Sequence, residues 1–350
     1  MVKITHDIDI YPYNTFHLHC SARNFTIVSS VEDAQTLLQD LETDISKILI
    51  LGGGSNILLQ DDIYDWLVVK NEIMWKEIIA QDKSSVTIKI WAGENRDEFV
   101  RRSIEQWYTG IEQLVSIPWC VWASPMQNIW AYGVEVKDVI TEVEYIHIET
   151  WETKTLSNPD CKFWYRESIF KKELKWQVII TYVSMKLGIY TPQTYSPNIS
   201  YGAIEEKLDT WNITPKLLAK TITQIRESKL PDWTKLGTAW SFFKNPYISS
   251  EQFEQLQKKH PEVKGWPVSD SPLDEWEMCT IYKLSAWQLI DLAGLKWYRS
   301  WDAGTYEKHA LVLINHGSAR GTDLVQVARH IQEVVEYKFG VEIEMEVNLA

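Results

Sequence analysis

The chain contains two uncharged, turn-rich segments of a kind that can bind a large anionic ligand through the backbone. The first is Gly52–Gly54, which follows the apolar residues 48–51 and precedes Ser55 and Asn56. Because glycine has no Cβ, its backbone N–H groups can approach a phosphate closely. The second segment, residues 124–133, is polar and carries no charge. A triglycine alone is equally compatible with a tight turn, and its spacing excludes a P-loop and a Rossmann turn.

Three other residues are suited to acid–base chemistry or to binding an anion. Ser241 has a hydroxyl that can donate a proton, and no nearby His/Asp set indicates a hydrolase triad. Arg166 offers a planar guanidinium that matches a carboxylate. Glu346 is either an ordinary strand glutamate or a carboxyl that holds a proton. No metal is expected, because the four cysteines are scattered and the N-terminal histidines lack further ligands.

Six sequence blocks, which together span nearly the whole chain, resemble the UDP-N-acetylenolpyruvoylglucosamine reductase (MurB) family of peptidoglycan synthesis. They occur in family order, at residues 52–56, 124–133, 163–171, 229–232, 241–246 and 344–347. The resemblance implies an α+β protein with a three-domain, PCMH/VAO-like fold that holds FAD between domains 1 and 2. It also implies NADPH-dependent, FAD-mediated reduction of UDP-N-acetylglucosamine enolpyruvate to UDP-N-acetylmuramate.

The same resemblance assigns roles to individual residues. It implies Ser241 as the proton donor, with Arg166 and Glu346 stabilising the enolate that follows hydride transfer. It implies a flavin-side strand at residues 14–16. The implied substrate ligands are Tyr201, Arg226, Lys229 and Asn245, although a solvated helix face explains Arg226 equally well. The implied FAD-binding residues are Gly52, Gly53, Gly54, Ser55, Asn56, Ser124, Gln127, Asn128, Ala131, Tyr132 and Gly133.

The tryptophans are anomalous in number and in position. The chain has 18 Trp and only 15 Gly, where average usage would give about 25 Gly. Five of the tryptophans stand at positions where the family motifs carry glycine: Trp119, Trp122, Trp130, Trp164 and Trp240. Seven more have turn-like neighbours: Trp66, Trp75, Trp91, Trp151, Trp287, Trp297 and Trp301. The pattern favours a genetic code in which UGA specifies glycine, so that most of these positions are glycine in the living protein. The alternative is a Trp-rich paralogue with a blocked flavin site.

The composition indicates a globular protein rather than a nucleic-acid or membrane protein. Hydrophobic residues make up 45% and charged residues 24% of the chain, and the net charge is −13. An acidic surface repels a phosphate backbone, so no nucleic-acid partner is expected. No run of 18 apolar residues predicts a membrane span, and the N-terminus lacks the apolar core of a signal peptide. We expect a cytoplasmic monomer that acts on a small sugar nucleotide.

Apolar periodicity predicts helices at residues 31–42, 96–107, 214–228, 251–259, 285–293 and 322–338. Ser30 and Asn95 are expected N-caps, and Gly321 or Thr322 is expected to cap the last helix. Alternation and apolar runs predict strands at residues 47–51, 67–69, 86–90, 143–148, 178–187, 310–314 and 341–347. The expected domains are 1–72 (FAD-binding domain 1), 73–213 plus 341–350 (FAD-binding domain 2) and 214–340 (substrate-binding domain 3).

Two other functions stay open from the residues. One is a flavin oxidase of the same superfamily that acts on another substrate. The set Arg166, Ser241 and Glu346 argues against it, because an oxidase does not need to protonate an enolate. The other is a non-catalytic paralogue that binds a sugar nucleotide without flavin, which follows if the tryptophans are genuine.

Overall fold

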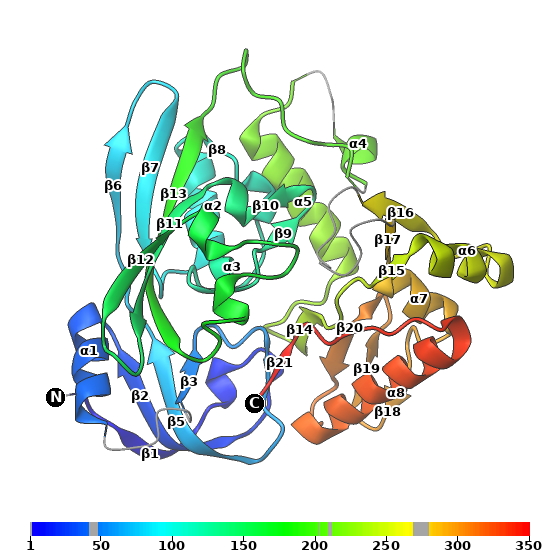
Figure 1. Ribbon diagram of the computed structural model, residues 1–350, viewed down its shortest axis with the longest axis horizontal. Helices are drawn as coiled ribbons and strands as arrows, with labels where there is room; N and C mark the ends of the chain where they lie inside the picture. The colour runs from blue at the N-terminus through cyan, green and yellow to red at the C-terminus, as the bar shows by residue number, and fades with distance from the viewer. Residues whose placement is uncertain (1, 42–47, 202, 209–211, 269–279) are drawn as a thin grey trace. The chain divides into compact units, whose positions relative to one another are not determined.

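The computed structural model describes residues 2–41, 48–201, 203–208, 212–268 and 280–350. The chain forms two compact units (Figure 1). The first unit contains residues 1–8, 22–53 and 65–228, and the second contains residues 9–21, 54–64 and 229–350. Helices and strands are mixed in both units, as expected for an α+β protein. None of the helices in the described ranges is both long and apolar enough to cross a membrane.

The first unit contains two sheets. One has the order β1-β2-β5-β3, with β3 and β5 parallel, and the other has the order β12-β11-β13-β7-β6, with β8 paired to the end of β13. The strands are β1 (Thr5–Asp9), β2 (Ser21–Val28), β3 (Ile48–Leu51), β5 (Ile63–Asn71), β6 (Lys76–Gln81), β7 (Ser85–Trp91), β8 (Tyr108–Thr109), β11 (Ile140–His147), β12 (Thr153–Ser157) and β13 (Val178–Ile189). The hairpin of β9 (Trp130–Ala131) and β10 (Val134–Glu135) begins within the predicted cofactor segment and ends just after it.

The first unit contains five α-helices in the described residues, and the first two begin at predicted side-chain caps. The helices are α1 (Val31–Asp40), α2 (Arg96–Glu105), α3 (Ala123–Met126), α4 (Ile204–Lys207) and α5 (Pro215–Lys229). The Ser30 hydroxyl accepts the Asp33 N–H, and the Asn95 amide oxygen accepts the Glu98 N–H. These bonds satisfy donors that the first helical turn otherwise leaves unpaired, so both predicted caps are confirmed.

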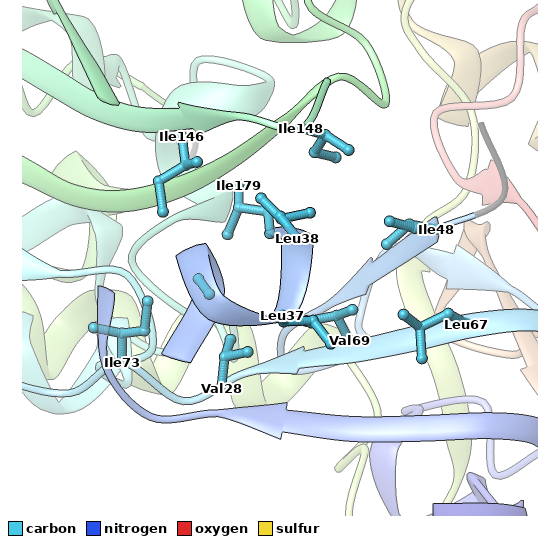
Figure 2. Packing of buried hydrophobic residues seen from close by; sticks show 11 residues of the cluster. Val28, Leu37, Leu38, Ile48, Leu67, Val69, Ile73, Ile146, Ile148 and Ile179 are labelled. Atoms are coloured by element: carbon cyan, nitrogen blue, oxygen red, sulfur yellow. The ribbon is translucent and has the colours of Figure 1, made fainter. Parts of the chain in front are cut away.

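Helix α1 joins the two sheets of the first unit through a buried apolar cluster (Figure 2). Leu38 of α1 lies toward Ile179 of β13, and Leu37 lies toward Val69 of β5. Ile146 of β11 belongs to the same cluster. This burial supplies the main driving force for the packing of this helix, whose own length is too short for independent stability.

The second unit contains an antiparallel sheet with the order β14-β20-β19-β18 and a smaller sheet with the order β15-β17-β16. Its elements are β4 (Ile57–Leu58), β14 (Gly237–Ser241), β15 (Tyr247–Ser249), α6 (Ser250–Lys259), β16 (Gly265–Val268), β17 (Ile281–Leu284), α7 (Ala286–Leu292), β18 (Arg299–Ser300), β19 (Ala303–Tyr306), β20 (His309–Asn315), α8 (Gly321–Phe339) and β21 (Asn348–Leu349). The long helix α8 contacts β18, β19, β20 and α7.

Several local predictions differ from the structure. Residues 14–16 form a turn rather than a strand. The predicted strand 341–347 is reduced to one bridge, between Met345 and Phe243, and the terminal strand is β21, parallel to β4. Arg320 rather than Gly321 or Thr322 is the N-cap of α8. Residue 47, at the start of one predicted strand, lies outside the described residues.

The structure also places the last ten residues in the second unit, together with residues 229–340. The strand that they form, β21, pairs with β4 of that unit. The division into three domains stays a prediction.

Candidate active site

A short antiparallel pairing in the second unit connects the segment that follows Ser241 with the segment that contains Glu346. Ser241 is the last residue of β14, opposite Val312 of β20. The Glu346 N–H donates to the carbonyl of Phe242 at 2.8 Å, and the Lys244 N–H donates to the carbonyl of Glu344 at 2.8 Å. Glu346 is buried and Ser241 is half-buried. Two segments that are about a hundred positions apart in the sequence are therefore hydrogen-bonded to each other.

The end of the glycine loop lies against the same paired segments. Gly54 has φ +59, and a Cβ there would lie 1.9 Å from the carbonyl oxygen of Tyr13, so only glycine fits. The Asn56 side chain donates to the carbonyl of Glu346 at 3.3 Å, and the Asn348 N–H donates to the carbonyl of Asn56 at 3.1 Å. Ser55, which precedes Asn56 in the sequence, is buried as well. These bonds connect the predicted cofactor loop to the predicted catalytic glutamate.

The turn at residues 14–16 supports this arrangement from the other side. Thr15 accepts the Thr238 N–H at 2.7 Å through its carbonyl and donates its hydroxyl to the carbonyl of Thr238 at 2.6 Å. The Thr15 N–H donates to the carbonyl of Gly54 at 3.2 Å. Thr15 therefore links the glycine loop to β14, which ends at Ser241.

The beginning of the glycine loop belongs to the first unit. There Gly52 and Gly53 lie against residues 118–122. A Cβ on Gly52 would lie 2.2 Å from the indole nitrogen of Trp122, whereas one on Gly53 would meet nothing closer than the Pro118 carbonyl oxygen at 3.6 Å. Gly53 is exposed. Its backbone hydrogen-bonds the Cys120 thiol, while the Trp122 indole covers Gly52.

The segment 124–133 is folded by its own polar groups. The Asn128 side chain donates to the carbonyl of Trp164 at 2.9 Å and to the Glu135 carboxylate, and it accepts the Lys137 N–H at 3.1 Å. Asn128 is therefore used mainly to hold the loop. Ser124 is fully buried, and its hydroxyl has no hydrogen-bond partner among the described residues. Gln127 and Ala131 are buried as well. A buried donor of this kind fits a polar cofactor better than an apolar core.

Tyr132, Tyr201 and Arg226 lie together in the first unit. The ring centroids of Tyr132 and Tyr201 are 6.3 Å apart, and a Cβ added to Gly133 would lie 3.8 Å from the Tyr201 Cβ. The Arg226 guanidinium hydrogen-bonds the Tyr132 hydroxyl and donates to the carbonyl of Ser116 at 3.2 Å. Burial raises the pKa of Tyr201 to about 12, so this hydroxyl stays protonated at neutral pH. Arg226 is thus part of the cluster rather than a solvated helix face.

Arg166 adds a further cation to this group. The positive charge of Arg166 lowers the pKa of both Arg96 and Arg226, and the charge of Arg226 lowers the pKa of Arg96. The backbone of Arg166 is left-handed, with φ +56, and its carbonyl accepts the Lys171 ammonium at 3.2 Å. The backbone on either side of it is closed by a bridge between Trp164 and Glu167. A left-handed residue other than glycine is strained, which is typical of a side chain held for function.

Lys229, His309 and Asn245 lie in the second unit. Lys229 is exposed at the end of α5, close enough to His309 to affect its pKa. The amide oxygen of Asn245 accepts the Ala286 N–H at 3.0 Å and so supports the start of α7. No group of three or more His, Cys, Asp or Glu side chains within the described ranges is arranged to hold a metal ion.

His309 makes stability depend on pH in a defined direction. Burial lowers its pKa from 6.5 to about 4, with a smaller contribution from Lys229 and Lys296. The unfolded chain therefore binds more protons between these values, and the stability contributed by neutral His309 is complete above pH 6.5 and lost toward pH 4. We expect roughly 1–3 kcal/mol of unfolding free energy to be lost over this range. Denaturant titrations at several pH values measure it.

The matched variants for this test are His309→Asn and His6→Asn. The first removes the titrating group, so its stability should fall less steeply below pH 6.5. The second changes an exposed histidine and should retain the slope of the parent. Equal slopes in all three proteins would contradict the role given to His309.

Six tryptophans have left-handed backbone: Trp107, Trp151, Trp176, Trp240, Trp297 and Trp301. Trp240, with φ +61, lies where the pairing of β14 with β20 shifts register, directly before Ser241. Trp151 lies in the turn between β11 and β12, and Trp107 follows the C-cap of α2. Glycine is the usual residue at a bulge or helix end with positive φ. Trp66 lies in β5, Trp91 ends β7 and Trp287 lies in α7, so the expectation of turns at these three positions was wrong.

Comparison with known proteins identifies the relationship. The reductase from Flavobacterium johnsoniae named UDP-N-acetylenolpyruvoylglucosamine reductase is 42% identical over 351 residues, covering 99% of this chain and 100% of that protein. A protein of the same name from Chromobacterium violaceum is 40% identical over 97% of both chains. This chain belongs to the UDP-N-acetylenolpyruvoylglucosamine reductase family. The model of an FAD binding domain matches residues 22–150, and that of the reductase C-terminal domain matches residues 232–350.

The fold agrees with this family. The crystal structure of the reductase (MurB) from Thermus caldophilus has a TM-score of 0.68 and 20% identity, covering 100% of this chain and 99% of that one. Sequence reasoning about the family site missed Arg96, which is buried at the start of α2. A charged residue in the first turn usually lies in solvent, so its position in the sequence carried no signal for burial.

Proposed function

We propose that the protein is an FAD-dependent, NADPH-using reductase that converts UDP-N-acetylglucosamine enolpyruvate to UDP-N-acetylmuramate in peptidoglycan precursor synthesis. The observation that carries the proposal is the full-length identity of 42% to a protein named for this activity. The pairing of residues 242–244 with 344–346 supports it, because it joins the segment that follows Ser241 to the segment that contains Glu346.

The proposal gives each group of residues a chemical task. Bound FAD supplies the hydride relay between NADPH and the substrate vinyl group. Gly52–Asn56 and residues 124–133 bind the cofactor, with the Ser124 hydroxyl as a buried donor available to it. Ser241 donates the proton to the α-carbon, since a positioned hydroxyl can act as a general acid.

Two further groups of residues stabilise negative charge on the substrate. Arg166 and Glu346 stabilise the enolate, Arg166 by its charge and Glu346 in a protonated state. Tyr201, Arg226, Lys229 and Asn245 bind the sugar nucleotide, whose diphosphate needs local cations on a chain of net charge −13.

Three finer statements belong to the same proposal. The enzyme works as a monomer, and it works in the cytoplasm, where UDP-sugars and NADPH occur. Its domains follow the family division into residues 1–72, 73–213 plus 341–350, and 214–340.

The test of the function is an anaerobic experiment on the purified, FAD-loaded protein. NADPH should bleach the flavin absorbance, and the enolpyruvyl sugar nucleotide should restore it faster than oxygen does. Faster discharge by oxygen would favour the oxidase of the same superfamily. A colourless protein that binds the sugar nucleotide without flavin would favour the non-catalytic paralogue.

We also propose that most of the tryptophans at family glycine positions are glycine in the living protein, through a code in which UGA specifies glycine. The left-handed backbone of Trp151, Trp240, Trp297 and Trp301 and the Trp122 indole against Gly52 support this proposal. The codons at Trp119, Trp122, Trp130, Trp164 and Trp240 test it. UGA at all five would agree with glycine, and UGG would contradict it.

A further inference from the structure

Arg96 is a buried cation whose hydrogen-bonding capacity is mostly unused. It is the first residue of α2, and only 1% of its surface is exposed. Its Nη2 donates to the carbonyl of Ile117 at 2.7 Å. Its Nε and Nη1 have no hydrogen-bond partner anywhere in the described residues. A buried charge with unpaired N–H groups is unfavourable by several kcal/mol unless an anion accompanies it.

The carboxylate nearest in sequence is already engaged elsewhere. The Asp97 Oδ2 accepts the Arg101 Nε at 2.9 Å, and its Oδ1 accepts the Ser116 N–H at 2.5 Å. Arg226 and Arg166 add positive charge near Arg96. Burial first, and then these charges, lower the pKa of Arg96 to about 9. The surroundings of Arg96 are therefore short of negative charge.

The position of Arg96 indicates which anion is missing. The Arg96 N–H donates to the carbonyl of Trp119 at 2.9 Å, so the start of α2 is attached to the loop 117–122. The same loop lies against Gly53, whose added Cβ would be 3.6 Å from the Pro118 carbonyl oxygen. A guanidinium with two unpaired N–H groups, next to a loop that packs on an exposed glycine turn, suits a diphosphate. All of these residues lie within the matched FAD-binding domain.

We propose that Arg96 binds the pyrophosphate of FAD through its two unpaired N–H groups, which rests on the proposed function. The planar fork of the guanidinium suits two phosphate oxygens at once. The Trp119 ring, 5.4 Å from the guanidinium carbon, covers one face of it and supplies no negative charge. Glycine at position 119 would remove this cover and widen the approach to the same N–H groups.

Arg96→Met tests the proposal, because methionine retains much of the length and removes the charge. The control is Arg102→Met, which changes an exposed arginine on the same helix. FAD, riboflavin, inorganic pyrophosphate and UDP are titrated into the apoproteins, with flavin fluorescence and thermal unfolding as readouts. Each variant is made in the parent chain and in the chain with glycine at positions 119, 122, 130, 164 and 240.

Arg96→Met should weaken FAD binding roughly ten- to a hundredfold. Riboflavin, which has no phosphate, should bind unchanged, and pyrophosphate should stabilise the parent and Arg102→Met but not Arg96→Met. Arg96→Lys retains the charge without the fork, so its FAD affinity should lie between the two. The Arg96→Lys variant also tests the proposal if Arg96→Met does not fold.

Three results would overturn the proposal. They are unchanged FAD affinity in Arg96→Met, an equal loss of FAD and riboflavin, and a loss of UDP binding without a loss of FAD binding. The outcomes separate this inference from the proposed function. A parent that fails to bind FAD in both backgrounds contradicts the function, while the pyrophosphate titration still tests Arg96.

Discussion

Replacing the six left-handed tryptophans by glycine should relieve backbone strain worth several kcal/mol of unfolding free energy. The positions are Trp107, Trp151, Trp176, Trp240, Trp297 and Trp301. Left-handed backbone costs a residue with a Cβ ~1–2 kcal/mol, and the greater freedom of glycine in the unfolded chain offsets ~0.4–1 kcal/mol of that gain. The net gain is roughly 0.5–1 kcal/mol per position, or ~3–6 kcal/mol for six. This is a large part of the ~5–15 kcal/mol that stabilises a typical protein.

Lost apolar burial opposes this gain, because each of the six side chains is at least partly covered. Five of the six side chains are 40% exposed or more, and only Trp240 is half-buried. Denaturant unfolding of the parent and the six-glycine chain measures the difference. Flavin retention should rise as well, because Trp240 precedes Ser241 and sits in the bulge that orients it.

The control for this prediction is Trp266→Gly. Trp266 is 54% exposed and lies in β16 with an ordinary extended pairing to Lys283. Glycine in a strand interior weakens it, so this variant should lose about 0.5–1 kcal/mol. If the six-glycine chain were destabilised like Trp266→Gly, the tryptophans would be genuine residues of the protein.

Ser241→Ala should separate the two half-reactions. Flavin reduction by NADPH should proceed at the parent rate, because that step needs no proton on the sugar. Product formation should slow by roughly 10²–10⁴-fold, the usual contribution of a general acid. Stopped-flow absorbance of the flavin measures the first step, and product yield in a single turnover measures the second.

Ser249→Ala is the matched control for Ser241→Ala. The Ser249 hydroxyl accepts the Gln252 N–H and caps α6 in the same unit. Its loss should lower stability by about 1 kcal/mol and leave both half-reactions unchanged. Equal slowing of both half-reactions in Ser241→Ala would contradict the role of this serine as proton donor.

The sequence by itself determined the family and the residues at which helices α1 and α2 begin. Ser30 and Asn95 cap α1 and α2 as predicted, because capping depends on residues within one turn. The motif blocks around Gly52, Ser241 and Glu346 predicted the function through resemblance.

The tertiary structure alone decided which residues meet. The Glu346 N–H reaches the Phe242 carbonyl across about a hundred residues, and the predicted strand 341–347 became a bridge and the short β21. The burial of Arg96 was decided in the same way. Such contacts depend on how distant segments pack, and no periodicity in a local window carries them. The sign of φ is decided in the same way. The bulge in β14 sets the positive φ at Trp240, whichever residue occupies that position.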